Sequence, residues 1–502
     1  MSLLRTKPFK PDHGNERGLK RVLTAWDLVL LGVGAVIGAG IFVLTGITAA
    51  TQAGPAVILS FLVAGFACAC AALAYAELAS AVGGAGSAYG YGYASLGELP
   101  AWIIGWMLLC EYMVAIPAVA TGWSGYVVNA LQSIGVGLSP LLTHGPDWFG
   151  SSAAGAGLIN LPAFLIVLVI GLLLASGAKA SAMFNAIMVA VKVAAILLFI
   201  GVAVFHINPA NWSPFIPPLE VSTTDASSGF SWEMRLIDAI KYGLGLGAGG
   251  ETHFGVVGIM TGAATIFFAY LGFDAVSTAA EETRNPQRDL PIGIIGSLLL
   301  CTALYIIVSI LLTGIVNYRE LNVPSPVAHA LLQIGQSWVA GIISIGAIAG
   351  LTTVILVMYF GLTRVLFAIA HDGLLPKFFA YVHPKTGTPV GSIATAGLIM
   401  LAFSGFVPLG KLAEIANIGT LGAFVVVCAG VIVMRRTHPD MPRPFRTPAS
   451  PLIPALGVLS CGYLMLNLVT FTWAAFGVWM LLGLVVYFGY SRTHSALAIN
   501  AP

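Results

Sequence analysis

The feature that most constrains this chain is the segment GVGAVIGAGIFVLTG, residues 32–46, in which five glycines interrupt an apolar stretch long enough to cross a bilayer. A second interrupted apolar segment, TIFFAYLGFDAVSTAAEETRNP, occupies residues 265–286. In hydrocarbon an unpaired backbone group is costly, so a helix is broken only where the break is buried in protein or faces a polar cavity. Two interrupted helices in corresponding positions of two halves are typical of the binding site of a secondary transporter.

The composition excludes an ordinary soluble globular protein. Hydrophobic residues make up 58% of the 502 residues and charged residues only 8%, whereas soluble domains carry about 25% charged residues. We therefore predict an all-α polytopic membrane protein with twelve membrane-spanning helices, each near the roughly 20 residues that a bilayer core requires. The predicted spans are 26–49, 56–81, 100–129, 160–178, 184–205, 258–280, 292–316, 338–366, 390–407, 413–434, 451–470 and 473–490.

Basic residues are distributed unevenly between the two sides of the predicted membrane. Most of the 22 Lys and Arg residues, including six before the first span, fall on the side of the N-terminus. Those on the other side are Arg235, Lys241, Arg319 and Lys411. Because cytoplasmic loops carry an excess of Lys and Arg, we predict that both termini are cytoplasmic and that the protein lies in the cytoplasmic (inner) membrane.

The predicted organisation is a single transmembrane domain with an internal repeat. Two sets of five spans form the repeat, and because five is odd the second set enters the membrane from the opposite face, which makes a 5+5 inverted repeat. A long outer loop, 206–257, joins the two sets, and a surface helix within it cannot be placed from the sequence. The predicted boundaries are 1–25 for a cytoplasmic N-terminal segment, 26–490 for the transmembrane domain, 26–205 and 258–434 for the two repeats, 451–490 for two further helices and 491–502 for a cytoplasmic tail.

Other classes of site find little support in the sequence. The six cysteines lie within predicted spans, and Cys68 and Cys70 have no further Cys or His nearby, so neither a disulfide framework nor a metal site is predicted. GVGAVIG has three residues between its second and third glycines, where a dinucleotide fingerprint has two. No basic run indicates nucleic acid, and no Ser-His pair or HExxH motif indicates an enzyme. We predict no cofactor.

Four segments of the chain carry a resemblance to a known family: GVGAVIGAGIFVLTG, GGAGSAYGYGYASLGELPAWIIGW (83–106), FFAYLGFDAVSTAAEETRNPQRDLPIGI (267–294) and RVLFAIAHDGLLPKFF (364–379). Together they resemble the amino acid–polyamine–organocation superfamily. The closing stretch GYLMLNLVTFTWAAFGVWMLLGLVVYFGYSRTHS and the GTLGAF of span ten resemble its cationic amino acid transporter branch in the bacterial form. The resemblance implies a LeuT-like fold with helices 1 and 6 unwound. Animal members of that branch have two further spans, so the resemblance does not imply that this chain shares their substrate preference.

The two broken helices can bind an amino acid through backbone groups alone. A half-helix that starts in mid-membrane offers unpaired N–H groups to a carboxylate, and the carbonyls that end a half-helix can accept from an ammonium group. The predicted substrate-binding residues are Val36, Ile37, Gly38, Ala39, Gly40 and Ile41 in the first segment and Phe268, Ala269, Leu271 and Gly272 in the second. The alternative interpretations are close helix packing at Gly34 and Gly38 and an ordinary core position, rather than a gate over the substrate, for Phe268.

Lys192 is the only basic residue deep in any predicted span. A charge at mid-membrane costs at least about 2.5–3.5 kcal/mol on insertion scales, so such a residue is a functional candidate. The resemblance implies that Lys192 lies at a cation site between spans one and eight, where its ammonium replaces a sodium ion, and that the coupling ion is a proton. The alternative is a permanently charged lysine that only tethers span one through its carbonyls.

Glu111 in WMLLCEYMVAIP is the deepest acid of the chain. It either selects cationic side chains in the binding pocket or, when protonated, makes a hydrogen bond that supports packing, and the sequence does not decide between these roles. The resemblance implies that the third helix lines the pocket and that Met358 on span eight faces it.

These features together predict proton-coupled symport of L-amino acids by alternating access. An amino acid exchanger and a non-transporting amino acid sensor remain alternatives, although a sensor would normally carry a soluble signalling domain. The predicted partners are the amino acid and the lipid bilayer. The sequence leaves open a small single-span membrane subunit, the oligomeric state and the identity of the preferred amino acid.

Overall fold

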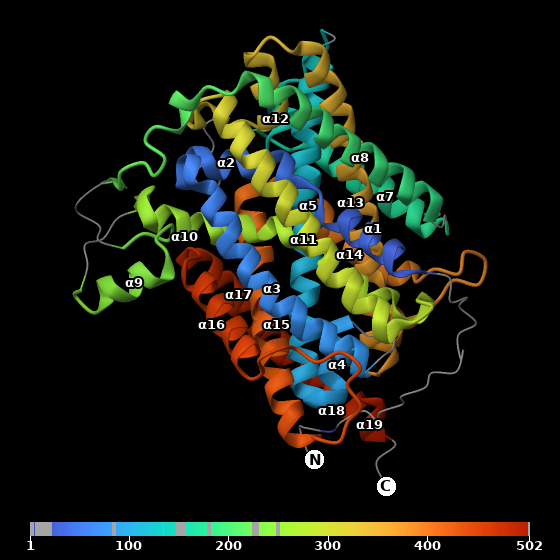
Figure 1. Ribbon diagram of the computed structural model, residues 1–502. Coiled ribbons are helices and arrows are strands. Elements are labelled where there is room, and N and C mark those ends of the chain that lie inside the picture. The colour runs from blue at the N-terminus through green and yellow to red at the C-terminus, as the bar shows by residue number, and fades with distance from the viewer. Residues whose placement is uncertain are drawn as a thin grey trace.

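Tilted helices make up most of the chain in the computed structural model (Figure 1). The structure describes residues 5, 23–82, 87–133, 135–146, 157–177, 182–222, 230–246 and 251–499. The predicted N-terminal segment 1–25 therefore lies outside the described residues except at Arg5 and from Leu23 onward.

The helices differ widely in length, from single turns to more than thirty residues. In the first half they are α1 (Ala25–Val36), α2 (Thr45–Thr48), α3 (Val57–Val82), α4 (Ser87–Ser95), α5 (Glu98–Ser133), α6 (Pro140–Thr143), α7 (Leu161–Ala175), α8 (Ala182–Ala203) and α9 (Leu236–Gly243). In the second half they are α10 (Gly255–Ile266), α11 (Pro286–Ile315), α12 (Pro326–Gln333), α13 (Ser337–His371), α14 (Val390–Phe406), α15 (Leu409–Thr437), α16 (Leu452–Leu466), α17 (Thr470–Val486), α18 (Arg492–His494) and α19 (Ala496–Ile499).

Among the described residues, seven helical segments are long and apolar enough to cross a membrane. They are Gly40–Ala81, Glu98–Gln132, Ile187–His206, Pro286–Ile315, Ser337–His371, Leu409–Thr437 and Thr470–His494. Shorter apolar helices of 10–17 residues are Ala25–Val36, Leu161–Ala175, Gly255–Tyr270, Val390–Phe406 and Leu452–Leu466. The chain is therefore a polytopic helical membrane protein, as its composition predicted.

The first two predicted spans are joined more tightly than the sequence indicated. After the break in the first segment, the chain stays helical through α2 and a π-helical turn at Ala49–Ala53, and it reverses at Gly54, whose φ is +62°. This left-handed conformation is one that glycine adopts readily. The turn leads directly into α3 by way of a short 3-10 turn at Gly54–Ala56.

The long loop between the two halves holds regular structure that the sequence did not place. Strands β1 (Glu220–Ser222) and β2 (Glu251–His253) pair antiparallel, and α9 stands apart from the main bundle at one side (Figure 1). The N–H of Phe254 donates to the carbonyl of Gln52 at 2.8 Å. This part of the loop is thereby attached to the π-helical turn Ala49–Ala53, which follows the first interrupted segment.

The broken segments lie inside the bundle because long helices surround them. The helix α5 packs against α13 and α15, α3 packs against α11, and α1 contacts α8, α11 and α13. The side chains at these contacts form one continuous apolar core. The π-helical turn Gly40–Leu44 contacts the 3-10 turn Phe267–Tyr270, so the two breaks meet.

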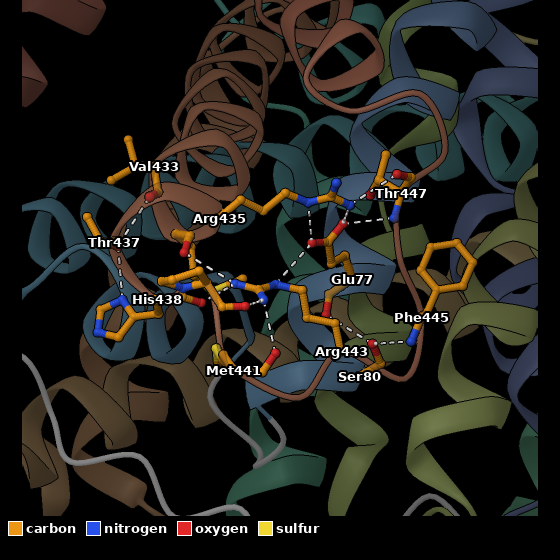
Figure 2. Close-up of polar contacts among 12 residues, drawn as sticks. Glu77, Ser80, Val433, Arg435, Thr437, His438, Met441, Arg443, Phe445 and Thr447 are labelled. Carbon is orange, nitrogen blue, oxygen red and sulfur yellow. Dashed lines mark hydrogen bonds and ion pairs between the residues drawn. The ribbon is translucent and has the colours of Figure 1, made fainter.

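A buried carboxylate fastens the end of α3 to the loop that follows α15 (Figure 2). Glu77 accepts from the guanidinium of Arg435 at 2.9 and 2.7 Å and from the N–H of Thr447 at 2.8 Å. Arg443 lies 3.5 Å from the same carboxylate and donates to backbone carbonyls of its own loop, including that of His438 at 2.6 Å. We call these residues the Glu77 cluster; it fixes the connection between α15 and α16.

Candidate functional site

The first break falls where the glycines predicted it. The helix α1 ends at Val36, and Ile37 takes an extended conformation with φ −72° and ψ 102°. The chain becomes helical again at the π-helical turn Gly40–Leu44. The first N–H groups of a helix have no partner within it, so the backbone of Ala39, Gly40 and Ile41 presents donors at this point.

The second break begins at the end of α10. After Ile266 the chain forms a 3-10 turn at Phe267–Tyr270, and Leu271 is extended with ψ 137°. Gly272 has φ +104°, a conformation that side chains rarely adopt, and a Cβ atom there would lie 3.1 Å from the Cβ of Ala35. A long 3-10 helix, Phe273–Glu282, then replaces the α-helix that the apolar pattern predicted to continue to residue 280.

The two breaks touch through backbone atoms. A Cβ atom built on Gly40 would lie 2.3 Å from the Cβ of Ala269 and 2.4 Å from its Cα, so only glycine allows this approach. The hydroxyl of Tyr305, on α11, lies 2.9 Å from the carbonyl oxygen of Val36 and 2.7 Å from that of Ala269. One hydroxyl group therefore bridges the carbonyls of both broken helices.

A small cavity lies at this meeting point, and its side chains are all apolar. Ten residues line it: seven of them are predicted binding residues, and the other three come from α1, α5 and α13. The polar groups at the cavity are therefore those of the backbone. The lining residues are Ala35, Val36, Gly38, Ala39, Gly40, Val119, Phe268, Leu271, Val354 and Met358. The other predicted binding residues, which the structure does not place in this lining, are Ile37, Ile41, Glu111, Ala269 and Gly272.

Lys192 lies between α1 and α13, the two helices that the resemblance implied. Its ammonium donates to the carbonyl of Gly34 at 2.6 Å and to that of Ile37 at 3.1 Å, and its side chain is completely buried. On the other side, a Cβ atom on Gly350 would lie 3.3 Å from the Cβ of Lys192. The lysine therefore holds the last carbonyls of α1, directly before the first break.

Glu111 occupies a separate buried region. It lies on α5, is fully shielded from solvent, and has Asp274 and Thr420 as polar neighbours. A Cβ atom on Gly419 of α15 would come within 3.5 Å of its backbone nitrogen. Its carboxyl is buried where α5 packs against α15 and against the segment after the second break. Both roles proposed from the sequence, selection of cationic side chains and a hydrogen bond that supports packing, stay open.

Sequence reasoning missed Tyr305, Val119 and Val354. A tyrosine in an apolar span was a usable signal, because a buried hydroxyl needs a hydrogen-bond partner. The sequence did not identify that partner. Nothing distinguished Val119 and Val354 from the many valines that face lipid or the core.

Comparisons with known proteins find relatives over nearly the whole chain. A family model described as amino acid permease matches residues 23–495. The branched-chain amino acid permease BcaP of Bacillus subtilis (strain 168) is 48% identical over 483 residues, covering 96% of this chain and 95% of the relative. The methylthioribose transporter of the same organism is 45% identical over 498 residues, 99% of each chain. The vacuolar cationic amino acid transporter 4 of Arabidopsis thaliana is 37% identical over 445 residues, 88% of this chain and 68% of the relative.

The fold is that of a polytopic helical membrane protein, and the relatives that the chain matches are permeases and transporters and not enzymes. The chain belongs to the amino acid permease family, within the amino acid–polyamine–organocation superfamily.

Proposed function

We propose that this protein transports L-amino acids across the cytoplasmic membrane by proton symport. The observation that carries the proposal is the meeting of the two broken helices at a cavity of about 10 Å³, which is lined by backbone groups and apolar side chains and must widen to admit an amino acid. N–H groups at the start of a half-helix can donate hydrogen bonds to a carboxylate. Carbonyls such as that of Val36 can accept hydrogen bonds from an ammonium group. In alternating access, one bundle rocks against the other around such a site.

The proposed arrangement in the membrane is a LeuT-like 5+5 inverted repeat. The seven long and five shorter apolar helices give twelve apolar segments, which supports the twelve-span prediction. In this arrangement α8 and α15 are the fifth helices of the two repeats, and α16 and α17 follow them. Both termini then lie in the cytoplasm, in keeping with the distribution of Lys and Arg.

The proposed substrate is an L-amino acid with an apolar side chain. Val119, Val354 and Met358 surround the cavity, and none of them can pair with a charge. The similarity to a relative named as a branched-chain amino acid permease supports the same choice. Glu111 lies outside the lining, which makes selection of cationic side chains the less favoured role for it.

The proposed coupling group is Lys192. Protonated, it donates to the carbonyls of Gly34 and Ile37 and so stabilises the end of α1. Deprotonated, its neutral amine donates only weaker hydrogen bonds to the same two carbonyls, and the end of α1 is held less firmly. Binding and release of one proton would thereby accompany each movement of α1.

Uptake of labelled L-leucine into proteoliposomes tests the function. Accumulation that depends on an inward proton gradient is the expected result, and unlabelled alanine should compete more strongly than arginine. Uptake that does not depend on the proton gradient but requires amino acid inside the vesicles would show that the protein is an exchanger. Binding without any uptake would make it a sensor.

A methylated thiosugar is the second candidate substrate, because a relative named methylthioribose transporter matches 99% of this chain at 45% identity. Methylthioribose carries neither a carboxylate nor an ammonium group, so the charge-binding backbone groups of the breaks would have no partner. Competition of unlabelled methylthioribose with labelled leucine separates the two candidates.

A further inference from the structure

Asn417 contacts the end of the helix that precedes the second break. It lies on α15, is completely buried, and its side-chain amide donates to the carbonyl of Ala264 at 2.8 Å and to that of Thr265 at 3.0 Å. Both partners are acceptors, and a side-chain amide can donate two hydrogen bonds only through its nitrogen. The orientation of the amide group is therefore set by its partners.

The two carbonyls belong to the last turn of α10, immediately before the second break. The carbonyls that end a helix have no partner within it and need donors from elsewhere. Where α10 gives way to the 3-10 turn Phe267–Tyr270, Asn417 supplies two such donors. The residues that follow this point, Phe268 and Leu271, line the cavity.

Lys192 makes the same kind of contact at the first break. Its nitrogen donates to two carbonyls, those of Gly34 and Ile37, at the end of α1. In each case a side chain from a helix outside the broken one holds the carbonyls that precede the break. In the proposed inverted repeat, the helices that carry the two residues, α8 and α15, occupy equivalent positions.

We propose that Asn417 is a positioning residue for substrate binding: it fixes the point at which α10 stops and so aims Phe268 and Leu271 into the cavity. The inference rests on the proposed function, in which that cavity binds the substrate. Lys192 and Asn417 then form a pseudosymmetric pair of clamps, one on each broken helix. The clamp on the first helix carries a charge, and the clamp on the second is neutral.

Hydrogen–deuterium exchange of the whole protein tests the clamp without any ligand. Asn417→Ala should raise exchange in peptides covering residues 264–272 and leave distant helices unchanged. The matched control is Asn467→Ala, because Asn467 is also buried and makes two hydrogen bonds, from Arg235 at 2.9 Å and to the carbonyl of Tyr463 at 2.9 Å, but does not contact the breaks. The control should leave exchange in residues 264–272 at the wild-type level.

Binding of L-leucine to the same variants tests the consequence for the site. Loss of both donors should weaken binding about tenfold, as expected when buried acceptors lose their partners, whereas the Asn467 variant should bind as tightly as the wild type. Asn417→Asp keeps the shape without the donors and should behave like the alanine variant. Asn417→Gln keeps the donors and should recover part of the affinity, which also covers the case in which the alanine variant does not fold.

The inference would be overturned if Asn417→Ala exchanged residues 264–272 at the same rate as the wild type and also bound leucine with the same affinity. An equal rise in exchange throughout the chain would overturn it too, because it would reduce Asn417 to a residue that only supports stability. A wild-type protein that binds no leucine would contradict the proposed function, and the exchange result would still decide whether Asn417 sets the second break.

Discussion

At the scale of single residues, the site depends on glycines that let the backbones approach and on side chains that hold backbone carbonyls in place. Gly40 lets the two breaks approach to backbone contact with Ala269, and Gly272 supplies the positive φ that reverses the chain after Leu271. The polar atoms that remain are backbone N–H and C=O groups, arranged by Tyr305, Lys192 and Asn417. Recognition of a substrate by such a site is sensitive to small displacements of the backbone.

Gly40→Ala should abolish or strongly weaken substrate binding. The added methyl group would lie inside van der Waals distance of Ala269, and forcing extra volume into a packed region costs typically about 1–3 kcal/mol. Gly341→Ala on α13 is the matched control, because a Cβ atom there meets no atom within 4 Å. Leucine binding to both purified variants measures the effect. Equal affinity in the two would show that the close approach of the breaks is unimportant.

Tyr305→Phe should weaken leucine binding by about tenfold, because it removes the hydroxyl that bridges Val36 and Ala269 and leaves a buried acceptor unpaired at a cost of about 1–3 kcal/mol. Tyr359→Phe is the control, since its hydroxyl donates to the carbonyl of Ile393 at 2.7 Å, away from the cavity lining. Titration with labelled leucine compares them. If Tyr359→Phe lost as much affinity for leucine, Tyr305 would act on binding only through the stability of the protein.

At the scale of elements, the glycine density and the apolar pattern predicted the two breaks, because only a buried or cavity-facing site tolerates broken helix in a membrane. The form of the chain after each break was not predictable in the same way. The π-helical turn at Gly40–Leu44 and the 3-10 helix at Phe273–Glu282 arise from contacts with other helices, which a local pattern does not contain. The small sheet and α9 in the long loop escaped prediction for the same reason.

The Glu77 cluster should be a principal stabilising contact of the loop between α15 and α16. Glu77→Ala leaves Arg435 and Arg443 without their buried carboxylate, and breaking a buried ion pair costs about 3–5 kcal/mol. Thermal unfolding in detergent should therefore show a clear fall in Tm. Glu220→Ala, which removes the exposed partner of Arg319, should leave Tm nearly unchanged because exposed ion pairs contribute little. Similar Tm values for the two variants would contradict this assignment.

At the scale of the whole molecule, composition alone was sufficient to predict a polytopic helical membrane protein. Of the residues singled out in the two interrupted segments, Val36, Gly38, Ala39, Gly40, Phe268 and Leu271 line one cavity, together with Met358, which the family resemblance indicated. The hydrogen-bond partners of Tyr305 and the places of Val119 and Val354 at the cavity could not be predicted, because they come from the packing of α5, α11 and α13 around the breaks. The place of Lys192 beside α1 followed from the family resemblance and not from spacing.

In the proposed function, substrate binding at the breaks is coupled to a proton on Lys192. Lys192→Gln is the informative variant, because it keeps a donor for Gly34 and Ile37 but cannot change its charge. If the lysine were only a tether, this variant would transport as the wild type does. If it is the coupling group, binding and exchange would survive while coupling is lost.

The most direct measurement is therefore accumulation of labelled L-leucine in proteoliposomes under an inward proton gradient, beside counterflow exchange without a gradient, for the wild type and Lys192→Gln. The account predicts that the wild type accumulates leucine and that the variant exchanges it but does not accumulate it. Accumulation by the variant at the wild-type level would contradict the assignment of Lys192 as the proton-coupling group.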